Sequence, residues 1–149
     1  MPVIDLYLSR GSLEAAQLQR LHAELVSVAL TIEGGDSPAS RALAWVLVHE
    51  LPDSAWSVGG ALTSPDNPRY LLRLTVPHGA LDPAKKERMV RELGSALSRV
   101  DPAASDPTRA WVVVHEVPDG AWGAGGRVYR LADIGAFVRG VDSAERLER

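Results

Sequence analysis

The chain has 149 residues, no cysteine, and 16 Lys and Arg against 19 Asp and Glu, for a formal net charge of -3 at pH 7. This length suits one core, or two half-units that share a core. The acidic balance argues against nucleic acid or an anionic membrane as the main partner, and no apolar stretch reaches the ~20 residues of a membrane span. Without cysteine there is no disulfide scaffold or thiolate chemistry. No signal peptide precedes the first strand, so we expect a cytoplasmic protein.

The first part of the chain predicts strand, helix and strand. Residues Val3–Leu8 form a β-type run. Ser12 is a plausible N-cap for a helix that reaches about Leu30, with apolar residues on one face. Gly34–Pro38 breaks this helix, and the apolar segment Trp45–Leu51 predicts the second strand.

The same order then recurs after a linker over residues 64–68. Tyr70–Val76 predicts a strand, and Asp82 with Pro83 reads as the N-cap and first residue of a second helix. Asp101-Pro102 ends that helix, and Trp111–Val117 predicts the last strand. Residues 128–138 are expected to pair locally, and the charged end from Asp142 to fray.

A self-repeat supports this reading. Residues 44–60 and 110–126 are identical at twelve of seventeen positions. We therefore expect one domain over 1–149, made of unit one (2–63), unit two (69–126) and a C-terminal extension (127–149).

Each unit is expected to be a right-handed β-α-β unit with parallel strands. Two units side by side predict an α+β fold, in which a four-stranded sheet carries two helices on one face. The strands lack regular polar alternation, so the other face should be apolar and uncovered. Oligomerisation through that face would bury it.

Pro2, the β-α-β repeat and the run Val114-His-Glu-Val-Pro-Asp-Gly-Ala-Trp-Gly-Ala-Gly-Gly126 together resemble the tautomerase superfamily. The similarity is to its 4-oxalocrotonate tautomerase branch in a fused, double-length form, and it extends from Pro2 to about Gly126. The resemblance implies the tautomerase/MIF-like fold, a homotrimer, and an N-terminal proline that acts as the catalytic base. It also implies a small-molecule carbonyl or enol acid as substrate, with no cofactor.

The chemistry of Pro2 fits this role if Met1 is removed. An α-amino group titrates near ~7.7–8.0, and burial or nearby cations lower that pKa. Such an amine can take a proton α to a carbonyl and return it elsewhere, which is keto–enol isomerisation. Proline inside a chain has only an amide nitrogen, so Tyr70, at the matching place in unit two, cannot replace Pro2.

The departures from the family bear on the substrate. Ser12 and Ala80 stand where one family arginine is expected, and Trp45 and Trp111 stand where a second is expected. A dicarboxylate substrate is therefore disfavoured. The glutamate that dehalogenating relatives place before the two glycines is Val58 in unit one and Ala124 in unit two, which disfavours water-activating chemistry.

Other residues are candidates for substrate binding. His78 ranks first, since the end of unit two's first strand is expected near Pro2 of a neighbouring subunit, and Arg73 and Arg127 follow. The remaining candidates are Arg10, Arg109, Trp56, Trp122 and Trp111. No metal site is predicted, because adjacent His and Glu residues on a strand point to opposite faces.

Two alternatives to a tautomerase stay open. One is a non-catalytic trimeric binding or structural protein that keeps the scaffold, which retention of Met1 would favour. The other is a different α+β dimer, such as a ferredoxin-like oligomer, in which Pro2 has no role. Native mass spectrometry showing a dimer would favour the latter.

Overall fold

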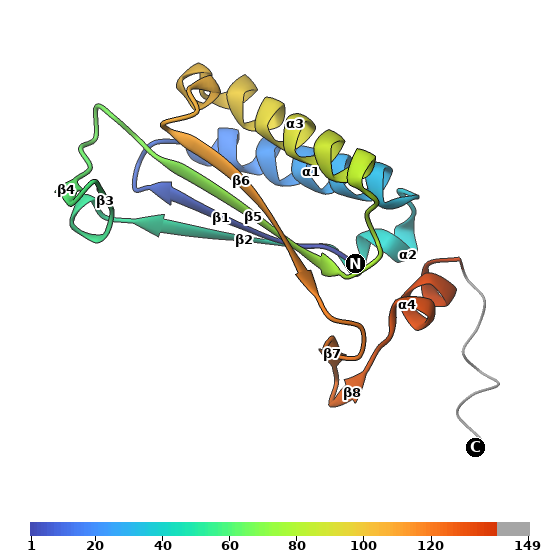
Figure 1. Cartoon of the computed structure of the whole chain (residues 1–149). Helices are drawn as coiled ribbons and strands as arrows, with labels where there is room; N and C mark the ends of the chain where they lie inside the picture. The colour runs from blue at the N-terminus through green and yellow to red at the C-terminus, as the bar shows by residue number, and fades with distance from the viewer. Residues whose placement is uncertain (140–149) are drawn as a thin grey trace.

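We describe a computed structural model of the chain over residues 1–139 (Figure 1). Unit one contains β1 (Val3–Ser9), α1 (Ala15–Glu33), α2 (Pro38–Arg41) and β2 (Trp45–Leu51). Unit two contains β5 (Tyr70–Pro77), α3 (Pro83–Val100) and β6 (Ala110–Val117). Short 3-10 turns follow β2 at Asp53–Ala55 and α3 at Pro102–Ser105, and the two hairpins and α4 are described below.

The sheet joins the two β-α-β units through their first strands. Its strand order is β2-β1-β5-β6, with β1–β2 and β5–β6 parallel and β1–β5 antiparallel. Val3 pairs with Trp45 in unit one, and Leu71 pairs with Trp111 in unit two. Tyr70 therefore occupies in unit two the place that Pro2 occupies in unit one.

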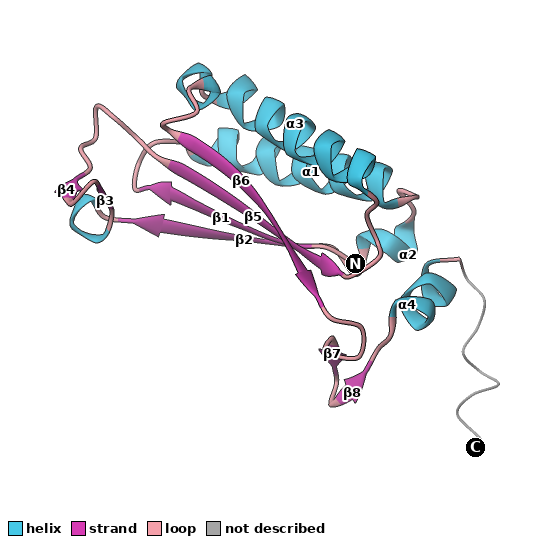
Figure 2. Ribbon diagram, viewed as in Figure 1, coloured by secondary structure: helices cyan, strands magenta, loops and turns pink. Residues whose placement is uncertain are grey.

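Both long helices cover one face of the sheet, as Figure 2 shows. Alternate residues of β1 and β5 point into this layer because side chains of a strand alternate between faces. Ile4, Leu6 and Leu72 are at most 1% exposed there, packed against Leu25 of α1 and Leu93 of α3. The predicted α+β architecture is confirmed.

The N-terminal cap is predicted correctly for α3 and wrongly for α1. Asp82 caps α3 as expected, because its carboxylate accepts a hydrogen bond from the Lys85 backbone N–H at 2.8 Å. Ser12 is not the cap of α1: its hydroxyl donates to the Ser9 carbonyl at 2.7 Å, and Glu14 is the N-cap. The helix also runs three residues beyond Leu30, to Glu33.

The opposite face of the sheet is open in the single chain. Trp45 and Trp111 are 64% and 65% exposed at its edges. Its centre is more polar than predicted, because Oδ1 of Asp5 lies 2.7 Å from Nε2 of His49 and the Arg73 guanidinium lies over the ring of Tyr7. The expected uncovered face is present, with apolar edges and a polar centre.

Two separate hairpins lie beyond opposite ends of the sheet (Figure 1). β3 (Ser57–Val58) pairs with β4 (Ala61–Leu62), and β7 (Gly123–Ala124) pairs with β8 (Arg127–Val128). The expected local pairing of residues 128–138 is wrong beyond Val128, because Leu131–Val138 forms the helix α4. The expected frayed end from Asp142 lies outside the described residues. Within residues 1–139, no helix has both the length and the apolar character needed to cross a membrane.

Candidate functional site

Pro2 is buried at the start of β1, where the chain enters the sheet. Its carbonyl accepts a hydrogen bond from the Trp45 backbone N–H at 3.0 Å, which fixes the backbone beside β2. Met1 precedes it, and the Met1 ammonium donates to Oε2 of Glu33 at 3.1 Å. The chain terminus is thus held inside the protein between the start of β1 and the end of α1.

Glu33 is a carboxylate in an unfavourable environment. Its side chain is 11% exposed, and burial raises its pKa, opposed by the N-terminal ammonium and by Lys85. Oε1 is buried and has no hydrogen-bond partner among the described residues. The carboxylate consequently depends on the terminal amine for most of its charge compensation.

A cavity of about 460 Å³ opens beside this amine. Met1, Glu33, Pro77, Leu131 and the exposed Arg139 contribute to its walls. We call this the amine cavity. Figure 1 shows α4 at this end of the sheet, near the N-terminus.

The end of β5 reaches the same place within one chain. Antiparallel pairing of Val3 with Thr75 brings the segment after Thr75 beside the N-terminus. The approach of a neighbouring subunit's strand end to Pro2 stays a prediction. His78 follows directly, but its side chain is 69% exposed, with Nδ1 3.5 Å from Oε2 of Glu116.

The second hairpin also lies at this end of the sheet, after β6 (Figure 1). It carries the predicted residues Arg127, which is exposed, and Trp122, which is half-buried. Gly125 and Gly126 have φ values of 57° and 78°, so they form the tight turn that positive φ allows to glycine.

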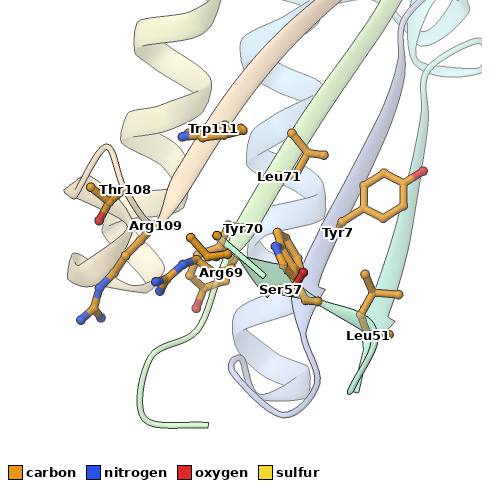
Figure 3. Close-up of a pocket in the computed structure, with 13 residues that line it drawn as sticks. Tyr7, Leu51, Ser57, Arg69, Tyr70, Leu71, Thr108, Arg109 and Trp111 are labelled. Atoms are coloured by element: carbon orange, nitrogen blue, oxygen red, sulfur yellow. The ribbon is translucent and has the colours of Figure 1, made fainter. Parts of the chain in front are cut away.

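Three other predicted residues gather at the opposite end, in a pocket of about 500 Å³ (Figure 3). Trp56, Arg109 and Trp111 line it together with Tyr70 and Arg69. We call this the unit-two pocket. It surrounds the place that corresponds to Pro2, so these residues do not approach Pro2 of their own chain.

The remaining two candidates lie elsewhere. Arg10 is exposed after β1, far along the strand from Pro2, and its backbone N–H donates to the Leu51 carbonyl at 2.8 Å. Arg73 is exposed on the open sheet face, with its guanidinium carbon 5.8 Å from the centre of the Tyr7 ring. Residues 1–139 contain no group of three or more His, Asp or Glu side chains suited to a metal ion.

Sequence reasoning missed Glu33, Arg139 and Arg69. Glu33 looks like an ordinary polar helix end, and its contact with Met1 spans 32 residues. Arg139 directly follows the helix α4, which the sequence does not predict. The repeat could have indicated Glu33, because it occupies in unit one the place of Asp101 in unit two.

This correspondence is visible in the hydrogen bonds. The Tyr70 hydroxyl donates to Oδ2 of Asp101 at 2.6 Å, as the Met1 ammonium donates to Glu33 in unit one. Burial, and secondarily the hydrogen bond to Asp101, raise the pKa of Tyr70. Both units therefore join the start of their first strand to a carboxylate at the end of their long helix, and unit one alone offers an amine there.

Several solved structures share this fold. A fused 4-OT named F6, an asymmetric trimer, is 19% identical over 99% of both chains, with a TM-score of 0.69. Pt0534, inactivated by 2-oxo-3-pentynoate, is 17% identical over 85% of this chain and 95% of its own, with a TM-score of 0.70. N1, of the cis-3-chloroacrylic acid dehalogenase family, is 14% identical over 98% of this chain and 96% of its own, with a TM-score of 0.69.

The chain thus has the fold of fused 4-OT proteins, as its sequence resemblance predicts. No protein-family model matches the sequence, and no curated protein matches it either. At these identities the likeness carries the fold alone.

The Tyr70–Asp101 hydrogen bond should stabilise unit two measurably. Tyr70→Phe leaves a buried carboxylate oxygen without its donor, so we expect the free energy of unfolding to fall by about 1–3 kcal/mol. The control Tyr129→Phe alters a ring that is 37% exposed and should change it by less than about 0.5 kcal/mol. Urea unfolding at one fixed protein concentration measures both, and equal effects would contradict the assignment.

Proposed function

We propose that this protein is a tautomerase in which the amine of Pro2, freed by removal of Met1, is the general base. The substrate is a small 2-oxo acid or its enol, and no cofactor takes part. The observation that carries the proposal is the terminal amine, in the structure that of Met1, held beside an open cavity and a largely buried carboxylate. A terminal amine without a role would ordinarily be solvated at the surface.

The cycle needs only the amine and the substrate. The neutral amine accepts a proton from the carbon next to the carbonyl, the C–H bond electrons move into the enolate, and an ammonium forms. The ammonium then returns a proton to a different atom of the enolate. Burial of Pro2 favours the neutral amine and keeps a fraction of it available near neutral pH.

Arg139 is our proposed anchor for the substrate carboxylate. Arg139 is exposed but contributes to the wall of the amine cavity. His78 does not line this cavity and lies beside Glu116 and Lys86. Arg127, in the second hairpin, is the next candidate after these two. A guanidinium binds a carboxylate through two parallel hydrogen bonds and stays charged at every relevant pH.

We also propose a homotrimer. The support is the trimeric state of the fused 4-OT F6, and the two exposed tryptophans, Trp45 and Trp111, at the edges of the open sheet face. Exposed apolar surface of this kind is typical of an interface.

A second candidate function is a non-catalytic trimeric binding protein. The unit-two pocket favours it, because Arg69 and Arg109 with Trp111 could hold an apolar carboxylate where no amine is present. Retention of Met1 in the purified protein would support this reading.

Maturation is the first test of the tautomerase proposal. The purified protein should begin at Pro2 by intact-mass measurement and should isomerise members of a panel of aliphatic and aromatic enol acids. Pro2→Ala should lower kcat/KM by roughly 10²–10⁴, the usual contribution of a positioned general base. Full activity in a Met1-retaining protein, or an unchanged Pro2→Ala variant, would contradict the mechanism.

The carboxylate anchor is tested by comparing two cations. Arg139→Gln should raise KM by about 10–100-fold at all pH values, which corresponds to a lost charged hydrogen bond of ~1.5–3 kcal/mol. His78→Ala should leave KM within about twofold. The opposite result, a raised KM in His78→Ala with an unchanged KM in Arg139→Gln, would assign the role to His78.

A further inference from the structure

The contact between the N-terminal amine and Glu33 has a consequence for proton transfer, which rests on the proposed function. We infer that Glu33 is a positioning residue: its carboxylate binds the Pro2 ammonium, orients it toward the amine cavity and favours its protonated state. The substrate does not need to touch Glu33 for this role.

The geometry provides the partner. The Met1 ammonium lies 3.1 Å from Oε2, and the two side chains are 10% and 11% exposed. Removal of Met1 places the new amine one peptide unit along the same backbone, at a residue that is itself buried. Oε1 of Glu33, which has no partner in the described part of the chain, is available as a further acceptor.

The charges around Glu33 leave the amine as its main counter-ion. Glu33 is the last residue of α1, where the helix dipole disfavours a carboxylate. Lys85 of α3 acts on it at longer range, and Arg139 of α4 lines the same cavity. His78, Lys86 and Glu116 form a separate group. A buried carboxylate in this setting is stabilised chiefly by the nearby ammonium.

The chemistry of a secondary amine gives the contact its function. Protonated proline has two N–H bonds. One N–H bond donates to Glu33, and the second N–H bond points away from Glu33. The second bond forms when the amine takes the substrate proton, and it breaks when the proton returns to the substrate. Glu33 remains a carboxylate throughout, so the only proton that is transferred moves between the substrate and the amine.

If Glu33 only stabilised the fold, its substitution would not change the pKa of the amine. Unit two provides the matched control. Asp101 makes the corresponding contact with the Tyr70 hydroxyl, which is no amine. Asp101→Asn should therefore weaken the fold without altering the amine, whereas Glu33→Gln should alter the amine directly.

The experiment is a pH titration of the full-length mature protein labelled with [¹⁵N]proline, observed by NMR. The sequence has ten prolines, and only one at the chain terminus has a titrating amine nitrogen. Glu33→Gln should lower the midpoint of that titration by about one to three pH units, because a nearby opposite charge favours the ammonium by that amount. Glu33→Asp should restore most of the shift, and Asp101→Asn should leave the midpoint unchanged.

Three results would overturn the inference: an unchanged midpoint in Glu33→Gln, an equal shift in Asp101→Asn, or a Glu33→Asp midpoint equal to that of Glu33→Gln. The titration requires no substrate, so it separates this inference from the proposed function. A shifted midpoint in a protein without turnover would contradict only the tautomerase proposal. Turnover with an unshifted midpoint would contradict only the role of Glu33.

Discussion

Antiparallel pairing of β1 with β5 is the constraint on which the rest of the structure depends. It joins two β-α-β units head to tail, so the start of each first strand lies beside the end of the other. The N-terminus consequently lies near the end of β5 and near α4, while Tyr70 lies near the hairpin that follows β2. Each strand start is thereby enclosed by segments of the opposite unit, and a terminal amine at Pro2 becomes an internal group instead of a surface one.

The two units place different chemical groups at their enclosed strand starts. Unit one places a chain terminus at the enclosed position, with Glu33 beside it and Arg139 on the cavity wall. Unit two places a buried tyrosine there, and its hydroxyl is tied to Asp101. The pocket around Tyr70 holds two arginines and two tryptophans but no base. We therefore propose proton transfer at one end of the scaffold and at most binding at the other.

The sequence predicts the elements of this fold well where the signal is local. Apolar periodicity marks both helices, Asp82-Pro83 marks the start of α3, and the repeat defines the two units. It fails at the cap of α1, where Glu14 displaces Ser12 because the Ser12 hydroxyl donates to the nearby Ser9 carbonyl. It also fails where contacts between distant residues decide. Glu33 cannot be read locally as a partner of the amine. Strand pairing groups Trp56, Arg109 and Trp111 at the end of the sheet remote from Pro2. Their spacing in the sequence does not reveal this grouping.

The central claim is that the mature chain has one reactive internal amine, at Pro2. The most direct test is exhaustive reaction of the purified protein with an electrophilic substrate analogue such as 2-oxo-3-pentynoate, followed by intact-mass and peptide mass spectrometry. The account predicts one adduct per chain, located on the N-terminal peptide at Pro2, and loss of activity in proportion to labelling. Adducts on unit two, or full labelling of Pro2 with undiminished turnover, would contradict it.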